Sequence, residues 1–429
     1  MPPSSVWANP SSLSDRAYRI MQSDRETVVI VGAGQAGAWV AITLRSLDPG
    51  RRIVLIGDEA HPPYERPPLS KAILAGKAGI ESAYIKPGNF YADNRIELML
   101  NRRVRHINRD RSSLTLDDGS SMEYGTLVLA TGCRPRMLAI QGADLPQVHT
   151  LRTIADVEKI AAWLKPEGKV VAIGAGFIGL EFASVAVEAG CSVTVVDAAP
   201  HAMGRVIDGS VAEVVAAGHQ GRGVDFRFST TIEKIEPDGD RAVVVLSTGA
   251  RLPSDLVIVG IGAVPNTDLA ETAGLACDDG IIVNAFGRTD DPKIFAVGDV
   301  TRHFNPLLGR SLRLESWQNA QNQGIAVAKA IAGTATPYAD LPWFWSDQYD
   351  TNLQIIGAPT AWDRIVWRGA PESGKFTAIY MQGEKVVAGN SMNNARDIRF
   401  IKQLILNGTP VPDAALADPS TSLAQLAKG

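Results

Sequence analysis

The stretch that decides the fold is Thr-Val-Val-Ile-Val-Gly-Ala-Gly-Gln-Ala-Gly, residues 27–37. Its first five residues are β-branched and mostly apolar, which predicts a buried strand. Gly32, Gly34 and Gly37 follow at once with GxGxxG spacing, and residues 39–47 predict a helix. Gly32 permits a tight turn, Gly34 lets the backbone approach a pyrophosphate, and Gly37 lets the helix pack closely on the strand.

A second predicted strand, residues 52–57, follows the helix and leads into Asp58. A lone GxGxxG also arises in chance loops, so the surrounding order of elements carries the inference. Strand, glycine turn, helix, strand and acid together are typical of a dinucleotide-binding unit, in which the acid binds a ribose diol.

The same pattern recurs further along the chain. A strand at residues 170–173 precedes Gly174, Gly176 and Gly179, and a helix is predicted over 180–189. A strand at 192–196 then leads into Asp197. Two complete units predict two dinucleotide sites, the alternative being one binding unit and one vestigial copy.

Two acids of the second unit bear on its ligand. Asp197 would bind the 2′-hydroxyl of an adenosine ribose and repel a 2′-phosphate, which favours NADH over NADPH. Arg205, a little further on, is the residue that would offset this preference. Glu181 lies in the first turn of the predicted helix. Spacing alone leaves two interpretations open: a carboxylate favoured by the helix dipole, or an acceptor for the nicotinamide carboxamide.

Composition limits the class of protein. The 429 residues are 45% hydrophobic and 21% charged, which indicates several globular domains of roughly 150 residues. Lys and Arg number 42 against 46 Asp and Glu, and a net charge of −4 argues against a nucleic-acid binder. No apolar run approaches the roughly 18 residues of a membrane span, and residues 1–26 lack the apolar core of a signal peptide. We therefore expect a soluble, cytoplasmic protein.

The sequence also argues against thiol and metal chemistry. Cys133, Cys191 and Cys277 form no CxxC or CxxxxC pair, so neither a disulfide framework nor a redox dithiol is predicted. The six histidines are scattered without ligand spacing, so no metal site is predicted. Any redox chemistry would then belong to a bound organic cofactor.

Three further segments carry a resemblance to a known family. Residues 127–129 lead into Ala130-Thr131-Gly132, residues 256–259 lead into a turn that contains Gly262, and residues 293–297 lead into Gly298-Asp299. This order resembles the flavoproteins of the glutathione-reductase type, which have two dinucleotide-binding domains. The resemblance implies non-covalent FAD in the first unit, a nicotinamide dinucleotide in the second, inserted unit, and Asp299 on the flavin's ribityl chain.

Longer motifs sharpen the resemblance to NADH-dependent ferredoxin reductases, which serve bacterial Rieske oxygenases and class I P450s. They are Pro-Tyr-Glu-Arg-Pro-Pro-Leu-Ser-Lys at 63–71, Arg-Leu-Glu-Ser-Trp-Gln-Asn-Ala-Gln-Asn-Gln at 313–323, and Pro-Trp-Phe-Trp-Ser-Asp-Gln-Tyr-Asp at 342–350. The resemblance implies that Arg66 and Lys71 contact FAD and that Trp317 packs beside its ring. It also favours the nicotinamide interpretation of Glu181, and we take Lys71, Glu181 and Trp317 as the catalytic candidates.

The resemblance implies an α/β fold with two Rossmann-like dinucleotide-binding domains, for FAD and NAD, and a small C-terminal α/β domain. The predicted limits are 26–148 with 265–338 for FAD, 149–264 for NADH and 339–429 for the C-terminal domain. Residues 1–25 are an extension expected to be flexible, the alternative being a short amphipathic helix at 13–21. The predicted FAD-binding residues are Gly32, Gly34, Gly37, Asp58, Arg66, Lys71, Ala130, Thr131, Gly132, Asp299 and Trp317. The predicted NAD-binding residues are Gly174, Gly176, Gly179, Glu181, Asp197 and Gly262.

The C-terminal segment predicts strands at 352–357, 364–368, 376–382 and 385–390 and a helix at 396–407. In the family this domain caps the flavin and helps to receive the ferredoxin. Five basic residues are candidates for steering an acidic partner, although an ordinary solvated surface explains each of them equally well: Arg310, Arg313, Arg396, Arg399 and Lys402.

The predicted function follows from what FAD can do. FAD accepts a hydride from NADH and can release electrons singly, which suits a one-electron [2Fe–2S] ferredoxin. Disulfide reductases of this fold carry cysteines just after the first acidic strand, and no cysteine occurs between Asp58 and Ile80. We therefore predict a ferredoxin–NAD(+) reductase that supplies a terminal oxygenase. The alternatives are a stand-alone NADH oxidase or rubredoxin-type reductase, and a flavin redox sensor of the apoptosis-inducing-factor type.

Overall fold

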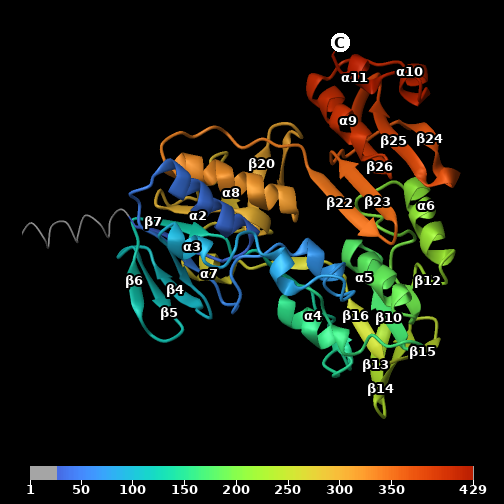
Figure 1. Cartoon of the computed structure of the whole chain (residues 1–429), viewed down its shortest axis with the longest axis horizontal. Coiled ribbons are helices and arrows are strands. Elements are labelled where there is room, and N and C mark those ends of the chain that lie inside the picture. Colours follow the sequence, from blue (N-terminus) through green and yellow to red (C-terminus); the bar gives the residue numbers. More distant parts are fainter. Residues whose placement is uncertain (1–26, 429) are drawn as a thin grey trace, which may run out of the picture.

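The structure is a computed structural model that describes residues 27–428. The predicted N-terminal extension and its alternative helix lie outside the described residues. Figure 1 shows three lobes: the first dinucleotide unit, the second unit beside it, and the C-terminal segment above the second unit.

The first unit is built on a parallel five-stranded sheet in the order β19-β7-β1-β2-β3. Its strands are β1 (Val28–Val31), β2 (Ile53–Ile56), β3 (Ile96–Met99), β7 (Thr126–Leu129) and β19 (Ile294–Ala296). Strands β1 and β2 are buried throughout, as their unbroken apolar runs predict. Helices α2 (Gln35–Leu47) and α8 (Trp317–Ile331) pack against each other beside the sheet (Figure 1).

The second unit repeats this plan with a parallel sheet in the order β12-β11-β10-β16-β9. Its strands are β9 (Val148–His149), β10 (Lys169–Ile173), β11 (Ser192–Val196), β12 (Asp225–Arg227) and β16 (Leu256–Val259), and its helices are α4 (Ile154–Ala161), α5 (Phe177–Glu188) and α6 (Gly209–Gln220). Helices α2 and α5 begin a few residues earlier than predicted because Gly34 and Gly176 are their N-caps. The glycine turns therefore lead directly into the first helical turns.

Smaller elements complete the two units. The three-stranded sheets are β4 (Val104–Asn108), β5 (Ser113–Leu116) and β6 (Ser121–Glu123); β13 (Ile232–Asp238), β14 (Arg241–Leu246) and β15 (Arg251–Ser254); and β18 (Ile281–Val283), β20 (Thr301–Asn305) and β21 (Arg310–Arg313). The pair β8 (Cys133–Pro135) and β17 (Ala263–Pro265) connects the units where the chain crosses between them. The short helices are α3 (Phe90–Asp93), α7 (Asp268–Thr272), η1 (Pro67–Ser70), η2 (Ile80–Ala83) and η3 (Gly298–Val300).

The C-terminal segment forms an antiparallel sheet in the order β22-β23-β26-β25-β24. Its elements are β22 (Trp343–Gln348), β23 (Thr351–Ile356), β24 (Arg364–Ala370), η4 (Pro371–Ser373), β25 (Lys375–Gln382), β26 (Lys385–Met392), α9 (Ala395–Asn407), α10 (Asp413–Ala417) and α11 (Leu423–Leu426). The four predicted strands and the predicted helix are present within a few residues of their expected limits. Sequence analysis did not assign the edge strand β22, which packs against α5 (Figure 1).

Gly34 and Gly37 of the first glycine turn should respond differently to substitution by alanine. A Cβ atom at Gly37 would lie 2.0 Å from the Gly32 carbonyl oxygen, whereas one at Gly34 would meet no atom within 4 Å. We expect Gly37→Ala to destabilise the fold by about 2 kcal/mol or more, and Gly34→Ala to leave stability nearly unchanged. Thermal unfolding of the cofactor-free proteins measures this, and equal melting temperatures for the two variants would contradict it.

Candidate functional site

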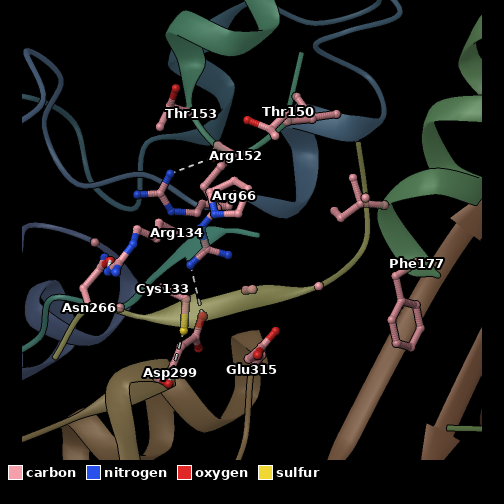
Figure 2. A pocket seen from close by; sticks show the side chains of 18 of the residues that line it. Arg66, Cys133, Arg134, Thr150, Arg152, Thr153, Phe177, Asn266, Asp299 and Glu315 are labelled. Atoms are coloured by element: carbon pink, nitrogen blue, oxygen red, sulfur yellow. Dashed lines mark hydrogen bonds and ion pairs between the residues drawn. The ribbon is translucent and has the colours of Figure 1, made fainter. Parts of the chain in front are cut away.

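One cavity of about 1640 Å³ lies where the two dinucleotide units and β22 meet. Both glycine turns open into it, and Figure 2 shows part of its wall. Of the predicted site residues, Gly37 and Gly179 lie beneath the cavity, packed against the turns. The others line it: Gly32, Gly34, Asp58, Arg66, Lys71, Ala130, Thr131, Gly132, Gly174, Gly176, Glu181, Asp197, Gly262, Asp299 and Trp317.

The first glycine turn leaves room for a ligand at its exposed edge. Gly32 has φ +113°, and a Cβ there would lie 2.1 Å from the Ala130 carbonyl oxygen. Gly34 borders open space at the N-terminus of α2, which is the end of a helix that attracts phosphate. This backbone cradle fits the pyrophosphate of a dinucleotide.

The second turn repeats this geometry. Gly174 has φ +105°, and a Cβ at Gly179 would lie 1.9 Å from the Gly174 carbonyl oxygen. Gly262 has φ +109°, and a Cβ atom there would lie 3.5 Å from the guanidinium of Arg205. The two turns therefore share the same backbone geometry.

Asp58 and Asp197 differ in the contacts that their carboxylates make. Asp58 is half-exposed and pairs with Arg103 at 2.8 Å. Asp197 accepts the backbone N–H of Ala175 at 2.6 Å and that of Ala199 at 2.7 Å, one at each carboxylate oxygen. Asp197 is thus held at the second glycine turn by both of its carboxylate oxygens.

Two arginines and Asp299 form another part of the cavity wall. Arg152 pairs with Asp299 at 3.1 Å, and its carbonyl oxygen accepts a hydrogen bond from Arg66 at 2.6 Å. Arg66 also pairs with Glu59 at 2.9 Å. Burial raises the pKa of Asp299, and Arg152 opposes that rise. Figure 2 shows Arg66 and Arg152 on one side of this space, with Asp299 and Glu315 across from them.

The turn at residues 130–132 is fastened to the returning chain. The Thr131 hydroxyl donates to the Asn266 carbonyl at 2.8 Å, and the Asn266 amide donates to the Thr131 carbonyl at 2.8 Å. Gly132 takes φ +62°. These contacts hold the turn beside Asp299 and leave its backbone facing the cavity.

The cavity wall also holds a largely buried ion pair. The ammonium of Lys71 lies 2.7 Å from Glu181 Oε2, and the two side chains are 19% and 4% exposed. The hydroxyls of Ser70 and Ser346 also donate to this carboxylate, the latter at 2.8 Å. Burial raises the pKa of Glu181, whereas Lys71 and the two serines oppose the rise. Residues from three distant segments thus meet at one carboxylate.

Strand β22 presents different residues to its two sides, because successive side chains alternate. Phe344 and Ser346 face the second unit, where Phe344 stacks on Phe177 of α5 with ring centroids 6.0 Å apart. Trp345 contacts Trp317 edge to face at 5.8 Å and stacks on Trp343 at 5.1 Å. Trp317 therefore lies in a tryptophan cluster that borders the cavity.

Sequence reasoning missed several residues of the cavity wall. Arg152 lies in a connecting segment without any motif, and Phe177 is hidden among the apolar residues of the second glycine turn. Cys133 directly follows the turn at 130–132 and donates its thiol hydrogen to the Asp299 carbonyl at 3.4 Å. In residues 27–428 no group of His, Cys, Asp or Glu is arranged to hold a metal. In the same range no helix is long and apolar enough to cross a membrane.

Two of the five basic candidates for partner binding are already engaged. Arg313 is 12% exposed and pairs with Asp279 at 3.2 Å and with Glu315. Arg310 donates to the Ala358 carbonyl at 2.9 Å. Arg396 and Arg399 lie exposed on α9, and Lys402 is half-buried. Helix α9 therefore carries more exposed positive charge than strand β21.

Comparison with known proteins assigns the family. The model of the family described as "Pyridine nucleotide-disulphide oxidoreductase" matches residues 26–324, and that described as "Reductase C-terminal" matches residues 343–427. The chain belongs to this oxidoreductase family. The assignment confirms the predicted α/β fold and the resemblance on which it rested.

Relatives match almost the whole chain. The anthranilate 1,2-dioxygenase system ferredoxin–NAD(+) reductase component of Burkholderia cepacia is 42% identical over 92% of this chain and 98% of its own length. Among solved structures, the ferredoxin reductase for the CYP199A2 system from Rhodopseudomonas palustris has a TM-score of 0.90 at 42% identity, covering 94% of this chain and all of its own. Putidaredoxin reductase in its covalent complex with putidaredoxin also has a TM-score of 0.90, at 40% identity over 94% and 98%. FAD and NAD(H) are the cofactors of these reductases, which confirms the predicted cofactors.

The thiol of Cys133 should be unreactive despite its place in the cavity wall. Burial raises its pKa to about 12, so almost no thiolate is present at pH 8. We expect iodoacetamide to label Cys133 at least about 100-fold more slowly in the native protein than in urea. Mass spectrometry of the labelled peptides measures this, with the part-buried Cys277 as an internal comparison. Rapid labelling of native Cys133 would contradict it.

Proposed function

We propose that this chain is an FAD-dependent ferredoxin–NAD(+) reductase that takes a hydride from NADH and passes electrons singly to a [2Fe–2S] ferredoxin of an oxygenase system. The named relatives agree with this class of enzyme and this kind of partner. The observation that carries the proposal is the buried Lys71–Glu181 pair in a cavity onto which both dinucleotide cradles open.

Particular residues would hold each cofactor. Gly32 and Gly34 would approach the FAD pyrophosphate at the start of α2, with Asp58 on the adenosine ribose. Asp299 would bind the ribityl chain, with Arg152 supplying positive charge beside it. The second turn and Asp197 would hold NADH in the same manner.

The reaction requires the protein to orient the two cofactors and to supply fixed charge beside them. FAD, when bound, accepts two electrons together from NADH and releases them one at a time. Lys71 would place a positive charge where negative charge accumulates on reduction, in a site with little water. Glu181 holds that ammonium and offers an acceptor to the nicotinamide carboxamide. None of these tasks needs a nucleophile, in keeping with the high pKa of Cys133.

Electrons would leave near the tryptophan cluster, where the C-terminal segment borders the cavity. Arg396 and Arg399 on α9 are the exposed charges we assign to steering an acidic ferredoxin, because complementary charge speeds encounter. We also propose that the enzyme works in the cytoplasm. Its three cysteines are unpaired, as is usual in a reducing compartment.

The test is ferredoxin-dependent reduction of cytochrome c by the purified flavoprotein and NADH. We expect rapid bleaching of the flavin by NADH and cytochrome reduction that requires a [2Fe–2S] ferredoxin. Flavin reduction followed only by oxygen consumption would instead support the oxidase alternative. A long-lived reduced flavin that passes electrons to neither acceptor would support the sensor. A protein that binds no flavin would refute the assignment of the first glycine turn.

The second cradle should discriminate against NADPH. The Asp197 carboxylate would repel a 2′-phosphate, and like charges in contact cost several kcal/mol, so we expect NADH to be preferred by at least about 10²-fold in kcat/KM. Asp197→Asn keeps an oxygen acceptor but removes the charge, and should reduce that preference about tenfold. Stopped-flow reduction with both nucleotides measures the ratio. An unchanged ratio in the variant would mean that Asp197 does not set the preference.

A further inference from the structure

A continuous chain of polar side chains, buried except at its outer end, runs from Glu181 along β22 to α6. The Ser346 hydroxyl donates to Glu181 Oε1 at 2.8 Å, and the Gln348 amide donates to Ser346 Oγ at 2.9 Å. His219 Nε2 lies 2.8 Å from Gln348 Oε1, and the Tyr349 hydroxyl lies 3.2 Å from His219 Nδ1. We call Ser346, Gln348, His219 and Tyr349 the polar string.

The hydrogen bonds of the polar string all point the same way along it. Gln348 Oε1 only accepts, so His219 Nε2 carries the hydrogen, and its Nδ1 is left to accept from Tyr349. Burial lowers the pKa of His219, which favours this neutral imidazole. Every member therefore donates toward Glu181, and hydrogen bonds aligned in this way polarise and strengthen one another.

The string joins two parts of the fold. Ser346 and Gln348 share one face of β22, whereas His219 projects from α6. Ser346 is fully buried, and Gln348 and His219 are at most 5% exposed. Side chains buried so deeply need all their hydrogen bonds, and a hydrophobic contact would join the same elements at lower cost. A role in positioning Glu181 explains why these three side chains are polar.

We propose that the polar string is a positioning device, in which His219, acting through Gln348 and Ser346, keeps Glu181 ionised and turned toward Lys71. This inference rests on the proposed function, because the purpose of holding Glu181 is the charge it sets beside the cofactors. The C-terminal domain thereby controls the central ion pair as well as covering it.

The charges around the string are consistent with this role. Lys71 is the charged group that faces Glu181 directly, and Ser70 donates from the same side. At the outer end, Arg222 lies 4.4 Å from the centre of the Tyr349 ring and pairs with Asp350 at 2.6 Å. Burial and Arg222 lower the pKa of His219, whereas its hydrogen bond with Gln348 raises it. Burial raises the pKa of Glu181, and Lys71, Ser70 and Ser346 are the groups that oppose this rise and favour the anion.

The test is a titration of Glu181 in the flavin-loaded protein without NADH or ferredoxin. Infrared difference spectra follow its protonated carboxyl band, identified as the band that is lost in Glu181→Gln. A hydrogen bond to a charged group is worth about tenfold in equilibrium, so Ser346→Ala should raise the deprotonation pH by about one unit. Gln348→Leu and His219→Phe should shift it in the same direction by progressively less. The midpoint potential of the flavin should rise as the Glu181 titration moves to higher pH, because a neutral Glu181 leaves the positive charge of Lys71 unbalanced.

Ser391→Ala is the matched control. Ser391 is fully buried on β26 of the same sheet, and its hydroxyl contacts no hydrogen-bond partner among residues 27–428. This substitution should leave the Glu181 titration unchanged, which separates loss of the string from loss of a buried hydroxyl. If Gln348→Leu and His219→Phe titrate like the wild type, the string does not act beyond Ser346 and the proposal is wrong. The proposed function fails separately, if the wild type passes no electrons to ferredoxin.

Discussion

The burial of the Glu181 carboxylate is the constraint on which the site depends. A carboxylate that is 4% exposed is costly unless a cation and hydrogen bonds surround it. Here the cation comes from the segment after η1, one hydroxyl from Ser70 and another from β22. No single domain supplies this set, so the cavity is complete only when all three parts of the chain have folded together. Breaking such a pair by removing one partner leaves an uncompensated buried charge.

Strand β22 contacts both dinucleotide units because its two faces present different side chains. Phe344, Ser346 and Gln348 engage the second unit, whereas Trp343 and Trp345 join Trp317 at the cavity edge. One edge strand thus packs on the second unit with one face and on Trp317 of the first unit with the other.

Local features of the sequence were sufficient to predict the two dinucleotide units. The apolar strands and the glycine turns are each continuous in the sequence, and the requirement for glycine at Gly32 and Gly174 is a backbone property. The Lys71–Glu181 contact was not predictable from spacing, since the two residues belong to different units and only folding brings them together. Arg152 carries no local signal, and the pairing of Arg313 with Asp279 joins segments that are distant in the sequence. The family resemblance supplied roles for Lys71 and Glu181 without indicating that they pair.

The central claim is that Lys71 and Glu181 act as one unit, and a double-mutant cycle tests it most directly. The measurement is the free energy of unfolding of the wild type, Lys71→Met, Glu181→Gln and the double variant, each with flavin bound. We expect each single change to be strongly destabilising and the second change to add little or to restore stability, with a coupling of at least about 1 kcal/mol. Additive effects of the two substitutions would contradict it, because they would mean that the two charges do not depend on each other.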